Sequence, residues 1–210
     1  MKEVMIHNGS IAVVAEYKEQ VIPDYRGNPF IESLLSLLST QEVIEKLTFY
    51  PQFNKRERQL DKHYRIHMID RLFQVFQPIP MTIELERKIS RVIRQGYLYR
   101  NPFGSRLAQD FYRDYHKNIS SIMNNKEYYP SSLGFTLIGI SGIGKTSSLN
   151  RILGLYPQII VHSEYKNIPF SMYQVVWIKL ECPYDGSIKG LLYEFFSEID
   201  RLLGTNYYQK

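Results

Sequence analysis

In the C-terminal part of the chain, apolar residues alternate between short continuous runs and helical spacing. Residues 135–138, 159–162 and 174–182 are short apolar runs, partly β-branched, of the kind found in buried parallel strands. Residues 149–153 and 188–203 place apolar side chains three or four positions apart, which predicts two amphipathic helices. The order strand, loop, helix, strand, strand, helix predicts an α/β fold with a parallel sheet.

The N-terminal part shows mainly helix signals, although its first 22 residues have no sustained period and residues 67–80 are predicted to be extended. Asn28 followed by Pro29 is a typical helix start, because asparagine caps free N–H groups and proline suits the first helical position. Ser39 and Glu42 have the spacing of a capping box at the start of a second helix. A third helix is predicted over residues 82–95, so this part is expected to be mainly helical.

The third predicted helix has an apolar face and a basic face. Its apolar positions are Leu85, Ile89, Val92 and Ile93, and its basic positions are Arg87, Lys88, Arg91 and Arg94. Arg87, Arg91 and Arg94 are candidates for contacts with a DNA phosphate backbone. A solvated helix face opposite the apolar residues is the competing interpretation, and both stay open.

The composition is that of a globular protein without a membrane span. Of 210 residues, 44% are apolar and 22% are charged, and the formal net charge is +5. A single cysteine, Cys182, rules out an intramolecular disulfide and suits a reducing compartment. No apolar run approaches the ~18 residues that a spanning helix needs, and the N-terminus lacks the apolar core of a signal peptide. We therefore expect a soluble, cytoplasmic protein with no membrane partner.

A glycine-rich loop lies between the first predicted strand and the helix that follows it. Residues 139–146 read Gly-Ile-Ser-Gly-Ile-Gly-Lys-Thr, which fits the Walker A pattern of phosphate-binding loops (P-loops). Glycines let backbone N–H groups point at a phosphate, and the positive end of the helix dipole adds to the attraction. Lys145 is predicted to contact the β- and γ-phosphates, and Thr146 to ligate Mg²⁺. The predicted nucleotide-binding residues are Gly139, Ser141, Gly142, Ile143, Gly144, Lys145, Thr146 and Ser147.

Hydrolysis normally needs a second part of such a site. An acidic residue at the end of another strand holds Mg²⁺, and a neighbouring Glu positions the attacking water. Residues 175–182, VVWIKLEC, come nearest to this pattern, but Lys179 occupies the position of the expected Asp. Glu181 lies two positions later and is interpreted as an ordinary strand residue. We therefore expect the chain to end before the acidic (Walker B) strand and to have no ATPase turnover alone, and we leave its catalytic residues unassigned.

Four segments resemble TnsC-like AAA+ ATPases, the regulators of target-selecting bacterial DNA transposons. They are YRGNPFIESL, RKISRVIRQGYLYRNP, LIGISGIGKTSSLNRILGLYPQIIVH and VVWIKLECPYDGSIKGLLYEFFSEIDRLLGTNY, in the family's order over about residues 23–208. The resemblance implies a P-loop NTPase (AAA+-like) parallel-sheet core that is incomplete at the C-terminus and follows a mainly helical N-terminal region. Residues 1–80 would then be a partner-interaction region, and residues 81–210 the first part of the ATPase domain.

The same resemblance implies a function. Members of the family bind ATP and Mg²⁺, assemble as homo-oligomers on target DNA, and link a target-selecting protein to the transposase. The chain is accordingly expected to be the ATP-binding N-terminal portion of a DNA transposition regulator. Two alternatives stay open: a signalling or partner-loading P-loop ATPase, and a non-catalytic interaction module in which residues 1–130 bind a partner.

Overall fold

The chain divides into two compact units that interleave along the sequence. The computed structural model describes residues 2–6, 10–104 and 133–206. Unit 1 comprises residues 1–36, 91–136 and 156–210, and unit 2 comprises residues 37–90 and 137–155. This division differs from the boundary predicted between residues 80 and 81, because each unit is assembled from segments that are far apart in the sequence.

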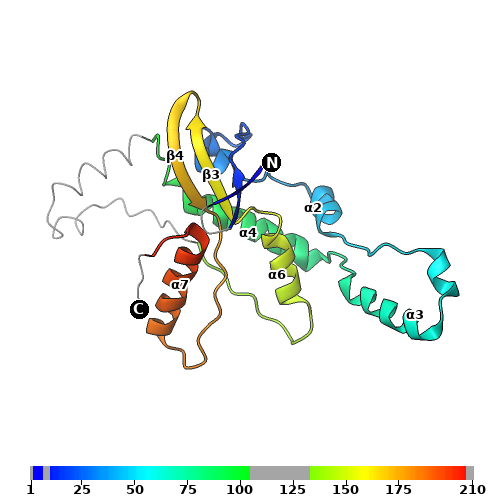
Figure 1. The fold of residues 1–210 in the computed structure, drawn as a ribbon. Helices are drawn as coiled ribbons and strands as arrows, with labels where there is room; N and C mark the ends of the chain where they lie inside the picture. Colours follow the sequence, from blue (N-terminus) through cyan, green and yellow to red (C-terminus); the bar gives the residue numbers. More distant parts are fainter. Residues whose placement is uncertain (1, 7–9, 105–132, 207–210) are drawn as a thin grey trace. The chain divides into compact units, whose positions relative to one another are not determined.

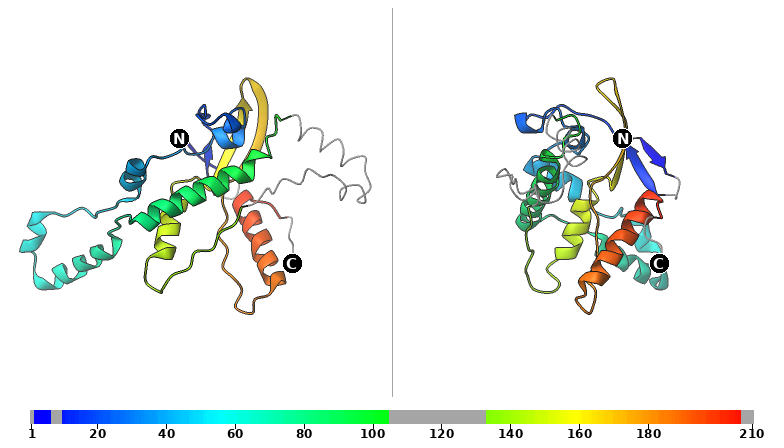
Figure 2. Two further views of the ribbon diagram at one scale, coloured as in Figure 1. Left: turned by 180° about the vertical axis from the view of Figure 1, so that it is seen from behind. Right: turned by 90° about the vertical axis from the view of Figure 1, so that its left-hand side faces the viewer.

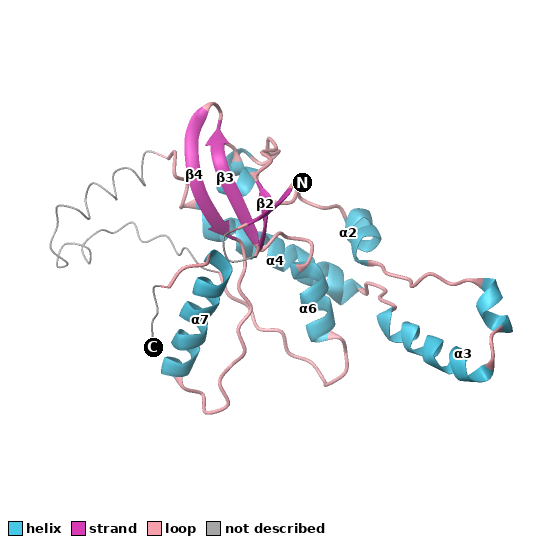
Figure 3. Ribbon diagram, in the orientation of Figure 1, coloured by secondary structure: helices cyan, strands magenta, loops and turns pink. Residues whose placement is uncertain are grey.

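Unit 1 contains a four-stranded mixed sheet (Figures 1 and 3). Its strands are β1 (Glu3–Met5), β2 (Ile11–Val14), β3 (Ile159–Tyr165) and β4 (Ile168–Val175), in the order β1-β2-β3-β4. Only β2 and β3 run parallel, with Val13 opposite Ile160, while the other two pairs are antiparallel. The α/β class is therefore confirmed, and the predicted all-parallel sheet is wrong.

A two-residue turn explains the antiparallel pairing of β3 and β4. Lys166 and Asn167 both have positive φ angles, 50° and 65°, which is the backbone of a tight hairpin turn. β4 consequently begins directly after β3 and ends at Val175. The strand predicted over residues 174–182 is wrong, since residues 176–182 form no strand.

The apolar core of unit 1 joins the sheet to the last helix. Ile6, Ala12, Ile159 and Leu202 form one buried cluster. Leu202 belongs to α7 (Ile188–Leu203), which begins at the cap residue Ser187 and ends at Gly204 with a left-handed φ of 68°. The helix predicted over residues 188–203 is confirmed, although Leu202 is its only buried residue. Two short helices, η1 (Pro23–Tyr25) and α1 (Pro29–Glu32), complete the N-terminal part of the unit.

Unit 2 is built from helices. α2 (Thr40–Leu47) has the predicted capping box of Ser39 and Glu42. It is followed by η2 (Lys55–Gln59), α3 (Lys62–Met68) and η3 (Ile69–Gln74). α4 (Pro80–Leu98) is one continuous helix, shown in green in Figure 2, whose residues up to Ser90 belong to this unit. α6 (Lys145–Leu153) carries the fully buried Ile152.

The strand predicted immediately before the glycine loop does not form. Residues 135–138 have no strand pairing, and Phe135 and Ile138 are 42% and 87% exposed. An apolar run becomes a strand only when a neighbouring strand offers a ladder of hydrogen bonds. Residues 135–138 pair with no strand of the sheet β1-β2-β3-β4, so this run has no such ladder.

No helix in the described part of the chain is long and apolar enough to cross a lipid bilayer.

Candidate functional site

The glycine loop of unit 2 leads directly into α6. Gly142 and Gly144 have left-handed φ angles of 81° and 90°, a conformation that residues with a side chain adopt only with strain. Gly144 is the N-cap residue, and a glycine has no side chain that could accept a hydrogen bond from the first N–H groups of the helix. These N–H groups and the positive end of the helix dipole are suited to bind an anion.

Lys145 folds back over the loop. Its Nζ donates hydrogen bonds to the carbonyl oxygens of Gly139, at 2.7 Å, and Ile140, at 2.8 Å. A Cβ atom on Gly139 would lie 3.6 Å from Cδ of Lys145, so this side chain runs close to the loop backbone. The ammonium group has three protons, and phosphate oxygens are stronger acceptors for them than neutral carbonyls.

The nine consecutive residues 139–147 hold all of the predicted nucleotide-binding residues. Ser141, Ile143, Thr146 and Ser147 are exposed, with Thr146 and Ser147 in the first turn of α6. Among the described residues, no group of three or more His, Cys, Asp or Glu side chains is placed to hold a metal ion. Mg²⁺ in phosphate-binding proteins keeps several waters and needs only one or two protein ligands beside the phosphates. A single hydroxyl ligand from Thr146 is therefore compatible with Mg²⁺ bound chiefly through a nucleotide.

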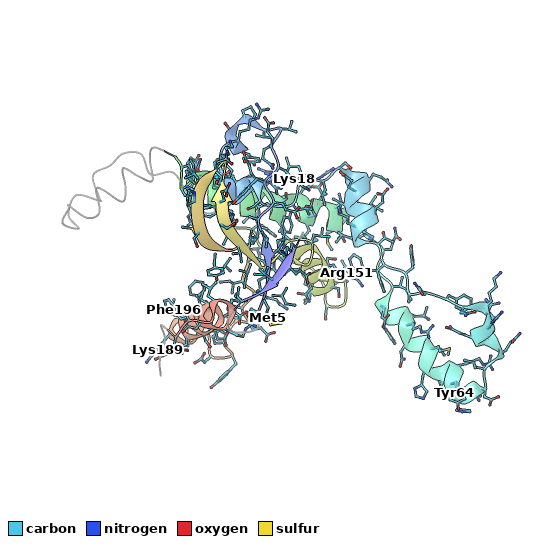
Figure 4. All side chains as sticks on the ribbon, turned by 45° about the horizontal axis from the view of Figure 1, so that its top comes forward. Met5, Lys18, Tyr64, Arg151, Lys189 and Phe196 are labelled. Carbon is cyan, nitrogen blue, oxygen red and sulfur yellow. The ribbon has the colours of Figure 1, made fainter. Side chains whose placement is uncertain are left out.

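The opposite side of α6 is anchored within unit 2. Ser148 is buried, and its Oγ lies 3.3 Å from Oγ1 of Thr82 on α4. Arg151, labelled in Figure 4, donates to the carbonyl oxygen of Gln74 at 3.0 Å. Its guanidinium lies 4.6 Å from the ring centroid of Phe76 and 5.5 Å from that of Phe49. No local pattern indicates this role of Arg151, because its partners lie more than 70 positions away.

Phe49 and Phe76 are themselves joined by the backbone. They form an antiparallel bridge in which each residue donates its N–H to the other's carbonyl oxygen at 2.9 Å. This bridge closes the chain segment between them at its base. Arg151 therefore connects the helix after the glycine loop to the base of that segment.

The predicted basic face of α4 is only partly as expected. Arg87 and Arg91 are exposed, and Arg87 bonds to Oε1 of Glu84 at 2.9 Å and to Oγ1 of Thr40 at 2.7 Å. Arg94 has no exposed surface and donates to the carbonyl oxygen of Leu35, so its assignment as a DNA contact is wrong. The reason is helical spacing: Arg94 follows the buried Ser90 by one turn, on the edge of the buried stripe.

A polar network in unit 1 was not predicted from the sequence. His162 on β3 is 1% exposed, with Nδ1 at 2.8 Å from Oη of Tyr17 and Nε2 at 2.9 Å from Oε1 of Gln174. Nε2 of Gln174 donates to the carbonyl oxygen of Phe30 at 3.0 Å, which leaves Oε1 as an acceptor. The network therefore assigns the proton of His162 to Nε2, and its Nδ1 accepts the hydrogen bond from the Tyr17 hydroxyl.

Burial controls the protonation of this network. Desolvation lowers the pKa of His162, and the hydrogen bond with Gln174 partly opposes this. Desolvation, followed by the charges of Tyr165 and Glu32, raises the pKa of Tyr17 to about 12. A neutral imidazole with both ring nitrogens bonded inside the unit is suited to a structural role and not to proton transfer with a substrate.

Comparison with known proteins adds no family assignment. The chain matches no protein-family model and no curated protein.

Proposed function

We propose that residues 139–147 bind the phosphates of ATP together with Mg²⁺. The observation that carries this proposal is the loop geometry. Two left-handed glycines lead into a helix whose cap residue, Gly144, has no side chain to occupy the first N–H groups, and Nζ of Lys145 lies over the same loop. Each of these features is needed to surround a phosphate group with donors.

Each residue has a separate role in the proposed complex. The backbone N–H groups from Gly142 to Thr146 donate to the phosphate oxygens. Nζ of Lys145 leaves the carbonyl oxygens of Gly139 and Ile140 and donates its hydrogen bonds to the β- and γ-phosphates instead. The Thr146 hydroxyl ligates Mg²⁺, which supplies positive charge beside the phosphates. Ser147 and Ser141 border the loop and are available to donate further hydrogen bonds.

The wider role we propose is that of an ATP-binding part of a DNA transposition regulator. The support for it is the resemblance of four segments to TnsC-like AAA+ ATPases, in which ATP-dependent assembly on target DNA links target selection to the transposase. Of the basic residues on α4, Arg87 and Arg91 remain candidates for phosphate contacts, since both are exposed. A P-loop NTPase core is part of the same proposal.

The test is nucleotide binding by Lys145→Ala. Losing a charge-assisted hydrogen bond costs about 1.5–3 kcal/mol, so the Kd for ATP with Mg²⁺ should rise roughly 10- to 150-fold. Lys88→Ala, which removes the same charge from an exposed position on α4, serves as the matched control and should bind like the parent. Titration of a fluorescent ATP analogue measures all three proteins.

Two results would contradict the proposal. One is equal affinity of Lys145→Ala and the parent with matching circular dichroism; the other is no binding by the parent at all. The second result would favour the non-catalytic interaction module, which the exposed apolar surface of unit 2 described below also supports.

A further inference from the structure

Residues 50–75 of unit 2, which we call the arm, expose apolar side chains to an unusual degree. The arm lies between the bridged residues Phe49 and Phe76 and contains η2, α3 and η3, none of which has a buried residue. Several of its large apolar side chains are more than half exposed: Phe53 62%, Tyr64 56%, Ile69 57%, Leu72 68% and Phe73 87%. Exposed apolar groups gathered in this way are typical of a surface that binds a partner.

The arm encloses an apolar pocket. The pocket has a volume of about 450 Å³, and its walls include Phe53, Met68, Ile69, Leu72 and Val75. A second pocket of about 390 Å³ shares Met68 and Arg71 with it and extends the surface to Leu60 and Tyr64, the latter labelled in Figure 4. The two pockets are therefore neighbours on the arm, and we call them together the groove.

The border of the groove is positively charged. The arm contains six Lys or Arg residues against three Asp or Glu. Three of the arginines, Arg58, Arg65 and Arg71, line the larger pocket. Arg71 pairs with Glu57 at 2.9 Å, whereas Arg65 makes no ion pair with any described residue. Charge complementarity therefore favours an occupant that carries carboxylates.

We propose that the arm docks an acidic amphipathic helix of a partner protein. Apolar side chains at positions i, i+4 and i+7 of that helix fill the groove beside Ile69 and Leu72, and carboxylates on its flanks pair with Arg58 and Arg65. Nucleic acid is the less suitable occupant, since Met68, Ile69, Leu72 and Val75 give the larger pocket an aliphatic wall that offers no partner to phosphates, and Arg71 is already paired with Glu57. This inference concerns residues outside the glycine loop and does not depend on nucleotide binding.

The test uses the full chain and a labelled helical peptide with Leu at i, i+4 and i+7 and Glu at the flanking positions. Fluorescence anisotropy should show saturable binding of this peptide and much weaker binding of a scrambled peptide of the same composition. Ile69→Glu should weaken binding by at least ~10-fold, because a charge enters an apolar anchor site. Arg65→Glu should lower the affinity for the acidic peptide and raise the affinity for a version of the peptide with Lys in place of Glu.

Two matched controls separate this effect from general damage to the arm. Ile66 is 58% exposed, almost as Ile69 is, but lines neither pocket, so Ile66→Glu should leave binding within about twofold of the parent. Lys62→Glu is the equivalent control for Arg65→Glu. Equal losses in Ile66→Glu and Ile69→Glu, equal binding of the scrambled peptide, or binding of a single-stranded oligonucleotide in place of the peptide would each overturn the proposal.

Discussion

Replacing Gln174 by leucine should destabilise unit 1 strongly while leaving its shape unchanged. Gln174 is 3% exposed, and its side chain accepts from Nε2 of His162 at 2.9 Å and donates to the carbonyl oxygen of Phe30 at 3.0 Å. The hydroxyl of Ser33 also bonds to Oε1 of Gln174, at 3.1 Å, but retains the carbonyl oxygen of Phe30 as a second acceptor at 3.3 Å. The N–H of His162 is therefore the group left buried without an acceptor.

The magnitude follows from these partners. A buried donor without an acceptor costs about 1–3 kcal/mol, and the lost hydrogen bond to Phe30 adds about 0.5–1.5 kcal/mol. We expect the free energy of unfolding to fall by about 2–4 kcal/mol in total. With a urea dependence of about 2 kcal/mol/M, the midpoint should move by roughly 1–2 M.

The single tryptophan makes this measurable for unit 1 alone. Trp177 belongs to unit 1, where its Nε1 donates to the carbonyl oxygen of Tyr156 at 3.0 Å, so its fluorescence follows the unfolding of this unit in urea. Ser171→Ala, at an exposed position of the same strand, is the control and should stay within ~0.5 kcal/mol of the parent.

A double variant tests the mechanism. Adding His162→Phe to Gln174→Leu removes the buried N–H that has no acceptor. The free energy of unfolding should therefore fall by less than the sum of the two single losses, by about 0.5–3 kcal/mol. Strictly additive losses, or a Gln174→Leu protein as stable as the parent, would refute the network described here.

Three further predictions concern other parts of the chain. Burial lowers the pKa of His162, so unit 1 should keep its full stability above the ordinary histidine pKa of about 6.5 and lose stability as pH falls below that value. Urea titrations at several pH values should show a smaller acid dependence for His162→Phe. Gly144→Ala should lower thermal stability by roughly 1–2 kcal/mol because of its φ of 90°, whereas Gly96→Ala in α4 should raise it by about 0.5–1 kcal/mol. If duplex DNA binds, Arg87→Gln with Arg91→Gln should lower the slope of log affinity against log salt by about 2, while the buried Arg94→Gln should reduce stability instead.

The elements that the sequence predicted correctly are those with local signals. The capping box of Ser39 and Glu42, the cap at Asn28 and the glycine that ends α7 each act within a few residues of their own helix. The helix after the glycine loop belongs to the same group, since its start at Lys145 depends on no distant partner, whereas phosphate binding by the loop stays a prediction. Such features are readable from a short window of sequence.

The features that were missed depend on partners far along the chain. Whether residues 135–138 form a strand depends on a partner strand elsewhere in the chain, and none of β1 to β4 pairs with them. Arg94 is buried because the carbonyl of Leu35, 59 positions away, accepts its hydrogen bond. The polar network likewise joins Tyr17 to His162 across 145 positions. Periodicity carries no information about any of these pairings.

The backbone bridge between Phe49 and Phe76 allows the arm to be altered, in evolution or by design, with little effect on the elements beside it. The residues of an antiparallel bridge have Cα atoms about 4.5–5.5 Å apart, so the chain returns at Phe76 almost to where it departed at Phe49. A segment with neighbouring ends can be lengthened, shortened or exchanged for another without moving the elements on either side, and doubling its length costs only about 0.6 kcal/mol in closure entropy. Partner recognition can therefore diverge through this insertion point, or be redesigned by grafting, while Arg151 and the helix of the glycine loop keep the contacts that they make at its base.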